Sequence, residues 1–243
     1  MELMKELPEG CIDMILCDLP YGETNNPRDH PLEFSGLWRQ YKRIIKANGA
    51  ILLFGQGKFF IDLVESNRSW YRYDLIWDKV LPTGFLNAKK MPLRSHEKIA
   101  VFYKHLPTYH PQFREGNPLH GRGKIYLTKD YPNRNYGKFK QMKDKRSGSK
   151  EKYPTSILRY AKPHPSKARH ATEKPVALLE NLIRTYTNEG ETVLDNCIGN
   201  GSTAVACIRS GRHYIGYELS EEYYKIAKER VEECVNDGHI YNG

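Results

Sequence analysis

The chain has 243 residues, of which 39% are hydrophobic, 28% charged and 12% aromatic, and its formal net charge is +9. This composition is typical of a folded protein with one substantial core or two small ones, and it excludes a chain that is disordered throughout. The amino-terminal segment lacks the apolar core of a signal peptide, and no stretch approaches the roughly 18 consecutive apolar residues of a membrane span, so we expect a cytoplasmic protein. The five cysteines show no close pairing, which indicates buried free thiols rather than a zinc or disulfide site.

The first part of the chain combines short apolar runs with one helical stretch. A strand is predicted over 12–17, directly before the sequence DLPYG at 18–22, and a helix is predicted over 33–47. Three further strands are predicted from apolar runs at 50–55, 72–78 and 98–103. Because no long helix separates the last two, we expect them to form an antiparallel pair at one edge of a sheet.

The positive charge is concentrated in one segment in the middle of the chain. Residues 104–169 contain 17 of the 38 basic residues and four of the 29 acidic residues, a local net charge of +13, which leaves −4 for the remainder. The segment is rich in Tyr, Pro, Gly and His and has no sustained apolar periodicity, so it predicts a loop-rich insert. Clustered Lys and Arg attract phosphates, and interleaved aromatic rings stack on bases. We interpret the insert as a surface for a polyanion, with a solvated linker as the alternative.

The last third of the chain alternates between helices and strands. The predicted elements are a helix over 176–187, a strand over 191–197, a helix over 202–210, a strand over 213–219 and a helix over 220–236. This alternation predicts an α/β fold with a doubly wound, Rossmann-like sheet that carries the antiparallel edge hairpin and the loop-rich insert. Residues 239–241 have strand character after a turn, and we expect them to add an edge strand beside 213–218, with the two termini close together. A frayed tail is the alternative.

A glycine-rich turn follows the predicted strand 191–197. The strand leads through Asp195 into a turn with Gly199 and Gly201, and Ser202 is placed to cap the next helix. Glycines let the backbone approach a ligand closely, and the helix start presents unpaired N–H groups. Glu218 follows Asp195 by 23 residues, close to the roughly 20-residue spacing at which an acid reaches ribose hydroxyls. These features together predict a cofactor of the adenosine type.

Three motifs resemble those of the DNA amino-methyltransferases, which modify N6 of adenine or N4 of cytosine. DLPYG is similar to the D-P-P-Y motif of that family, LDNCIGNGST (194–203) to its S-adenosylmethionine loop, and HATEKP (170–175) to its H-P-T-E-K-P segment. DLPYG comes first and the basic insert lies between the two halves, which is the order of the β group. Leu19 and Ala171 stand where the family most often has proline.

The resemblance implies a role for each motif residue. Asp18 and the carbonyl of Leu19 or Pro20 would accept hydrogen bonds from the exocyclic amine of a flipped base, and Tyr21 would stack on that base. The implied cofactor is S-adenosylmethionine. The residues assigned to it are Asp195, Gly199, Gly201, Ser202, Glu218, His170, Thr172, Lys174 and Phe54.

Two further segments have assignments that depend on the same resemblance. Basic side chains of the insert would bind the DNA backbone, namely Lys138, Lys140, Lys143, Lys145 and Arg146. Arg94, His96 and Glu97 would orient the pocket or the DNA, with a satisfied ion-pair cluster as an equal alternative. Apart from any ligand, Thr172 would cap a helix whose first positions are residues 173–175.

We therefore predict an enzyme that transfers a methyl group from S-adenosylmethionine to N6 of adenine at a short specific site in duplex DNA. Residues 1–104 would form the catalytic half, 105–165 the target-recognition insert and 166–243 the cofactor-binding half. Adenine is preferred because cytosine-modifying relatives more often have serine at the position of Asp18. Double-stranded DNA is the expected partner, no membrane or metal is expected, and a homodimer and a companion restriction endonuclease are left open.

Other functions share parts of this pattern. A cytosine-N4 DNA methyltransferase has the same motif order, and methyltransferases that act on RNA or on a protein glutamine use the same cofactor. A non-catalytic nucleic-acid-binding module is a further alternative, which binding of S-adenosylmethionine would test. Dinucleotide binding is disfavoured because Ala204 replaces the third glycine of G-x-G-x-x-G.

Overall fold

A computed structural model of the chain describes residues 2–22, 33–118, 148–162 and 173–238. These residues belong to two compact units, one formed by Met1–His110 with Thr155–Gly243 and the other by Pro111–Pro154. Within the described ranges, no helix combines the length and the apolar character that crossing a membrane requires.

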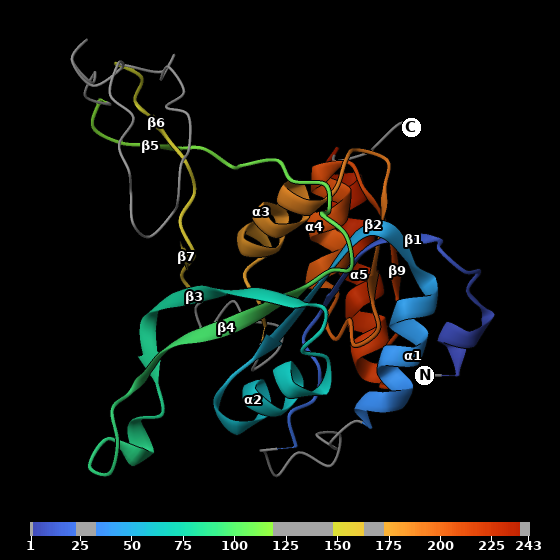
Figure 1. Cartoon of the computed structure of the whole chain (residues 1–243), viewed down its shortest axis with the longest axis horizontal. Helices are drawn as coiled ribbons and strands as arrows, with labels where there is room; N and C mark the ends of the chain where they lie inside the picture. The colour runs from blue at the N-terminus through green and yellow to red at the C-terminus, as the bar shows by residue number, and fades with distance from the viewer. Residues whose placement is uncertain (1, 23–32, 119–147, 163–172, 239–243) are drawn as a thin grey trace, which may run out of the picture. The chain divides into compact units, whose positions relative to one another are not determined.

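The larger unit is built on a seven-stranded sheet with the order β7-β3-β4-β2-β1-β8-β9 (Figure 1). Neighbouring strands run parallel, except that β4 is antiparallel to both β2 and β3. The strands in chain order are β1 (Ile12–Cys17), β2 (Ile45–Gly55), β3 (Tyr71–Thr83), β4 (Arg94–Phe102), β7 (Ile157–Arg159), β8 (Thr192–Asp195) and β9 (His213–Gly216). The predicted α/β, Rossmann-like sheet is confirmed.

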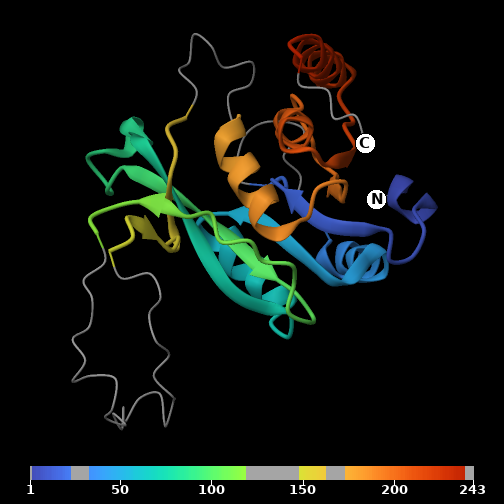
Figure 2. The ribbon, with the colours of Figure 1, turned by 90° about the horizontal axis from the view of Figure 1, so that it is seen from above.

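Helices cover both faces of this sheet, as the view from above shows (Figure 2). One face is covered by α1 (Phe34–Ile44) and α2 (Gly57–Ser66), and the other by α3 (Val176–Tyr186) and α4 (Ser202–Ser210), against which α5 (Glu221–Asn236) packs. Two short 3-10 helices complete the unit, η1 (Leu3–Glu6) and η2 (Phe85–Asn87). The arrangement buries the central strands from both sides.

The central strand β1 shows how the sequence produces these two layers. All six of its residues are buried. Ile15 and Cys17 belong to the core under α1 and α2, whereas Met14 and Leu16 belong to the core under α3 and α4. A strand that is covered on both faces has a nearly continuous apolar sequence, because successive side chains point to opposite faces.

Several predicted boundaries change in the structure. The antiparallel pair is confirmed as β3 and β4, but it does not form the edge of the sheet, because the three residues of β7 pair with β3. The helix predicted over 33–47 ends at Ile44, because Ile45 pairs with Ile12 and starts β2. The edge strand predicted for 239–241 lies outside the described residues.

The start of α3 also corrects a prediction. The helix begins at Val176 with Pro175 as its N-cap, so residues 173–175 are not its first turn. The residue before a proline is disfavoured in the helical conformation, which moves Lys174 out of the helix. Lys174 is then placed by the approach to the helix rather than by the helix itself.

The smaller unit is described at its two ends. There β5 (Arg114–Glu115) pairs antiparallel with β6 (Glu151–Lys152), and the rings of Phe113 and Tyr153 lie 5.0 Å apart. The structure thus describes a short ladder within the basic insert, while the five basic residues predicted to bind DNA lie outside the described residues.

Candidate active site

The carboxyl ends of β1 and β8 form a topological switch point. After β1 the chain continues through α1 to β2 on one side, and after β8 it continues through α4 to β9 on the other. In open α/β sheets, ligands bind in the crevice outside such strand ends. Asp18 follows β1 directly and Asp195 ends β8, so the two motifs that are 177 residues apart in the sequence meet at one edge.

Asp18 is held by two side chains. The Tyr21 hydroxyl donates to Asp18 Oδ1 at 2.8 Å, and the Lys174 ammonium contacts Asp18 Oδ2. The Asp18 side chain keeps 28% of its surface exposed. Because a carboxylate has about four acceptor positions, it retains capacity for a further donor.

A chain of ion pairs extends from Asp18 into the sheet. Lys174 Nζ lies 3.4 Å from Glu97 Oε2, and Lys79 Nζ lies 3.4 Å from Glu97 Oε1. The Lys174, Glu97 and Lys79 side chains are all less than a tenth exposed. Lys174 Nζ also lies 5.0 Å from the centre of the Phe54 ring. This chain joins β1, β4 and β3 to the segment before α3.

Burial and the neighbouring charges have opposite effects on the pKa values of Lys174 and Glu97. Burial works against the charged ammonium of Lys174, yet Asp18 and Glu97 together raise its pKa above the usual value for lysine. Burial likewise works against the Glu97 carboxylate, yet Lys174 and Lys79 lower its pKa below the usual value. The charges of Lys174 and Glu97 are therefore stabilised by the oppositely charged groups beside them.

Leu19 and Tyr21 of DLPYG both pack against other side chains. Leu19 is 2% exposed and belongs to the core, so an apolar side chain fills the position where the resembled family most often has proline. The Tyr21 ring stacks on Phe59 with 4.5 Å between centres. Burial and the nearby Asp18 raise the pKa of Tyr21 well above the usual value. Among the described residues, none donates a backbone hydrogen bond to the carbonyl oxygens of Leu19 and Pro20.

The two glycines of the cofactor turn have different surroundings. Gly201 has φ +82°, and a Cβ there would lie 3.0 Å from Ala227 of α5. Gly199 has φ +54°, and a Cβ there would meet only the Cys197 carbonyl oxygen at 4.0 Å. Gly201 therefore permits close helix packing, whereas the space beside the Gly199 Cα is open.

Glu218 and Asp195 hold this turn through their carboxylates. Glu218 Oε2 accepts from the Gly199 N–H at 3.0 Å and Oε1 from the Ser220 N–H at 2.7 Å. Asp195 Oδ2 accepts from the Thr203 hydroxyl at 2.6 Å. The strand predicted over 213–219 ends earlier, at Gly216, and Glu218 lies two residues beyond its end. It still lies beside the turn, because the Tyr217 N–H donates to the Asp195 carbonyl.

Ser202 does not cap α4 as predicted. Gly201 is the N-cap, and Ser202 is the first helical residue. Its hydroxyl lies 3.1 Å from Arg230 of α5, and Arg230 forms an ion pair with Glu173 at 2.8 Å. The segment that carries Lys174 is thereby tied to the start of α4, a link that no local sequence pattern indicates.

The other predicted site residues are distributed as follows. Glu97 is buried in the ion-pair chain, whereas Arg94 and His96 are exposed on the same strand. His170 and Thr172 lie outside the described residues. The assignment of Lys174 to the cofactor stays a prediction, and its ion pairs in the structure are with Asp18 and Glu97.

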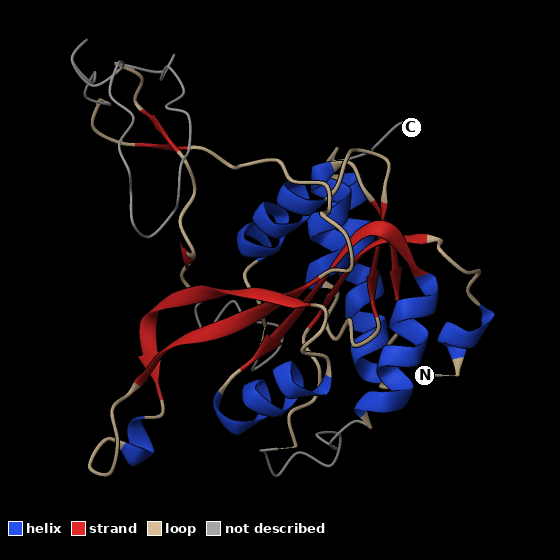
Figure 3. Cartoon of the chain, in the orientation of Figure 1, coloured by secondary structure: helices blue, strands red, loops and turns tan. Residues whose placement is uncertain are grey.

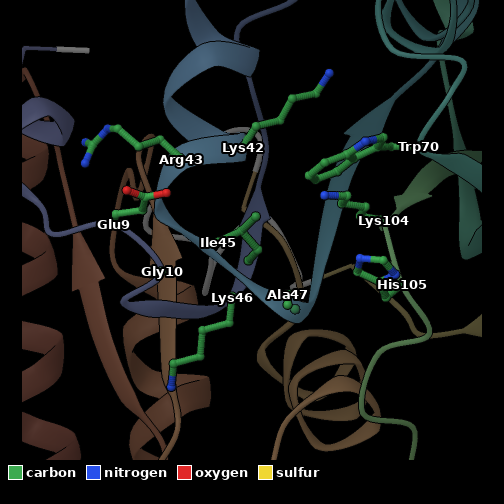
Figure 4. Close-up of a pocket in the computed structure, with 11 residues that line it drawn as sticks. Glu9, Gly10, Lys42, Arg43, Ile45, Lys46, Ala47, Trp70, Lys104 and His105 are labelled. Carbon is green, nitrogen blue, oxygen red and sulfur yellow. The ribbon is translucent and has the colours of Figure 1, made fainter.

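A separate pocket of about 360 Å³ lies at the opposite, amino-terminal edge of the sheet (Figure 4). Gly10 precedes β1 and Ile45 starts β2, so the pocket is separated from Asp18 by the length of β1. Its lining is Glu9, Gly10, Lys42, Arg43, Ile45, Lys46, Ala47, Gly49, Trp70, Lys104 and His105. Asp18 and the glycine turn take no part in it.

Asp195 is expected to make stability depend on pH. Burial raises the pKa of its carboxyl to about 6, from 3.8 in an unperturbed chain. The folded state therefore binds the proton more tightly, and the contribution of Asp195 to the free energy of unfolding is full below about pH 4 and is lost as the pH rises through 6. The difference between these two pKa values corresponds to about 3 kcal/mol in the free energy of unfolding.

Urea unfolding of the native chain and of an Asp195→Asn variant would measure this effect. We expect the native chain to gain stability relative to the variant as the pH falls from about 7 to about 4, because the amide does not titrate. A difference that stays constant over this range would show that the Asp195 carboxyl titrates normally.

The comparisons with known proteins agree on one family. A family model described as DNA methylase (N6_N4_Mtase) matches residues 12–229. The type II methyltransferase M.HpaI of Haemophilus parainfluenzae is 25% identical over 97% of this chain and 73% of that protein. The DNA adenine methyltransferase YhdJ of Escherichia coli (strain K12) is 24% identical over 94% of this chain and 79% of that protein.

Solved structures show the same fold. The M1.HpyAVI–SAM complex superposes with a TM-score of 0.59 at 23% identity and covers 94% of both chains. The PvuII DNA methyltransferase, which is cytosine-N4-specific, superposes with a TM-score of 0.61 at 14% identity and covers 98% of this chain and 89% of that one.

Proposed function

Because the chain belongs to the N6/N4 DNA methylase family, we propose that it methylates N6 of adenine at a short specific site in duplex DNA. As a member of that family it is a site-specific DNA methyltransferase that depends on S-adenosylmethionine. The observation that carries the proposal is the placement of Asp18 beside the glycine turn at the switch point of the sheet.

The choice of adenine is supported by Asp18, since cytosine-modifying relatives more often have serine there. YhdJ is named a DNA adenine methyltransferase and matches nearly the whole chain. Cytosine N4 is the second candidate, because the PvuII enzyme has the same fold. Both products arise from an exocyclic amine, so the site chemistry below applies to either.

The amine of a nucleobase is a poor nucleophile, because its lone pair is delocalised into the ring. Asp18 would accept one hydrogen bond from this amine, and the carbonyl oxygen of Leu19 or Pro20 would accept the other. Both hydrogen bonds would pull the N–H groups out of the plane of the ring, so that the nitrogen lone pair points toward the methyl donor. Tyr21 and Lys174 fix the plane of the Asp18 carboxylate, so the acceptor is already in position before the base arrives.

The residues around the glycine turn fit the donor. The space beside the Gly199 Cα is open, Glu218 accepts hydrogen bonds, and the apolar side chain of Leu219 is fully exposed. Glu218 would bind the ribose hydroxyls and the turn would bind the amino-acid part. S-adenosylmethionine would supply an electrophilic methyl group on a sulfonium. Transfer would break the methyl–sulfur bond, leave S-adenosylhomocysteine and release one proton of the amine, so the protein's contribution is to align the amine with the methyl group.

The DNA itself would be bound by the insert. Its net positive charge suits a phosphate backbone, and the residues proposed for these contacts are those named from the sequence, Lys138, Lys140, Lys143, Lys145 and Arg146. The division into a catalytic half, an insert and a cofactor-binding half remains part of this proposal. So do the homodimer and the companion endonuclease.

Product analysis tests the proposed activity. The chain would be incubated with genomic duplex DNA and labelled S-adenosylmethionine, and the DNA would then be digested to nucleosides. We expect label in N6-methyladenine. Label in N4-methylcytosine alone would overturn the choice of adenine, and label in neither base would overturn the proposed function.

Glu218→Ala is expected to weaken donor binding by about 1.5–3 kcal/mol, as is typical for hydrogen bonds to a charged group. The variant also frees the Gly199 N–H, so part of the loss would come from a less ordered turn. Isothermal titration with S-adenosylmethionine measures the effect. Glu222→Ala, on the exposed first turn of α5, serves as the control and should bind the donor normally. Equal affinities for the two variants would remove Glu218 from the donor site.

A further inference from the structure

The hairpin that joins β3 to β4, residues 79–96, carries a group of exposed apolar side chains. It extends away from the sheet, with η2 near its tip (Figure 3). The side chains of Phe85 and Leu86 in η2 are 77% and 84% exposed. The other exposed apolar residues of the hairpin are Val80, Leu81, Met91 and Leu93. Exposed apolar patches of this kind mark sites of interaction.

The charge of the hairpin favours a polyanion as its partner. Residues 79–96 contain no acidic residue and four Lys or Arg residues, Lys79, Lys89, Lys90 and Arg94. Lys79 is buried against Glu97, but Lys89, Lys90 and Arg94 are exposed around the apolar tip. An apolar tip surrounded by positive charge is complementary to stacked bases between phosphates.

The hairpin starts at the edge of the sheet that holds Asp18. Trp77 pairs with Glu97 and Asp78 with His96 at its base. Glu97 in turn contacts Lys174, which contacts Asp18. The hairpin therefore projects from the same edge at which a target base has to enter.

Polar contacts hold the hairpin in shape without covering its apolar side chains. Lys79 Nζ donates to the Thr83 hydroxyl at 3.2 Å, and that hydroxyl donates to the Arg94 carbonyl at 3.3 Å. At the tip, the N–H of Asn87 donates to the Gly84 carbonyl at 3.0 Å. The tip is thus presented on an ordered support.

We propose that this hairpin is a wedge that enters the DNA duplex. Phe85 and Leu86 would lie against the bases next to the target after it has left the stack, and Lys89 and Lys90 would contact the adjacent phosphates. Extracting a base costs a few kcal/mol. Apolar side chains are known to insert between base steps of distorted DNA, and here they would fill the space that the extracted base leaves. The proposal rests on the proposed function, because the wedge is placed to act on DNA from which the target base has been extracted.

A double variant, Phe85→Ala with Leu86→Ala, tests the wedge. Leu106→Ala is the matched control, because Leu106 is 81% exposed and lies beyond the opposite end of β4. We expect the double variant to lower kcat on long duplex DNA by about tenfold or more while DNA affinity changes less than about threefold, because the wedge acts after binding. The double variant should match the native chain in its affinity for S-adenosylmethionine and in its molecular mass measured by analytical ultracentrifugation. The conservative variant Phe85→Leu should retain most of the activity.

Charge variants test the phosphate contacts. Lys89→Gln with Lys90→Gln should reduce the slope of log affinity against log salt by about 0.9 for each phosphate that the hairpin no longer neutralises. An unchanged slope would contradict the placement of the hairpin on DNA.

Two results would overturn the wedge. One is a double variant with the native kcat on duplex DNA. The other is a change in sedimentation mass, which would assign the apolar tip to contact with a second copy of the chain. In both cases the native chain still methylates DNA, so failure of the wedge is distinct from failure of the proposed function.

Discussion

Replacing Asp18 by alanine is expected to abolish methyl transfer, with kcat lowered by at least about 10²–10³-fold, the effect typical of losing one preorganised hydrogen-bonding group. The amine loses its acceptor, whereas the glycine turn and Glu218 are unchanged and should bind the donor normally. Lys174 keeps Glu97 as a partner, so the fold should persist. Transfer of labelled methyl groups to duplex DNA and calorimetric donor binding measure the two effects separately.

Asp18→Asn is the informative companion, because the amide keeps the shape and one acceptor oxygen but has no negative charge. We expect partial activity, between that of the native chain and that of the alanine variant. If donor binding disappears together with activity in either variant, Asp18 belongs to the donor site and the division of roles between the two motifs is wrong.

Replacing Lys174 by methionine is expected to lower the free energy of unfolding by about 1.5–3 kcal/mol, the loss typical of hydrogen bonds to charged groups, because Asp18 loses its ammonium partner and Glu97 keeps only Lys79. The Glu97 side chain is 8% exposed, so solvent does not replace the lost ammonium. Activity should fall as well, since Asp18 loses one of the two groups that orient it. Urea unfolding measures the stability, and transfer assays well below the unfolding transition measure the activity.

The control is Lys225→Met, because Lys225 also pairs with a glutamate, Glu221, at 2.8 Å, but with both side chains largely exposed. We expect a change of less than about 0.5 kcal/mol there. The pH dependence adds a second readout. Since the lysines lower the pKa of Glu97, the stability that this acid contributes is present at neutral pH and is lost as the pH falls through its carboxyl range. The loss in Lys174→Met should therefore be larger at neutral pH than in acid, and equal losses would contradict the ion-pair chain.

Local signals in the sequence predict those parts of the site that depend on local structure. The apolar run before Asp18 predicts the buried strand β1, and the glycines after Asp195 predict the turn and the start of α4. Such signals depend on residues within one turn or one strand of each other. The helix α2 is not among the predicted elements, although the apolar spacing of Phe59, Phe60 and Leu63 is a signal of the same kind.

The ion-pair chain could not be predicted in this way. Lys174 and Asp18 are 156 residues apart, and Glu97 reaches them only because β4 runs antiparallel beside β2. The order of strands follows from the packing of the whole sheet, which no local pattern encodes. The edge strand β7 escapes prediction for a related reason, since three residues in a polar segment give no alternation to detect.

The position of β1 in the sheet also affects how the chain folds while it is being synthesised. β1 is a central strand, yet one of its two partners, β8, comes late in the chain: Val193 pairs with Met14 and follows it by 179 residues. At about 5–20 residues per second, a ribosome needs roughly 10–40 seconds to supply that partner. During this interval one side of a largely apolar strand is open, which is the condition under which unpaired edges aggregate. Newly made chains are therefore expected to need chaperones until β8 has emerged, and nonsense codons before it should give insoluble products.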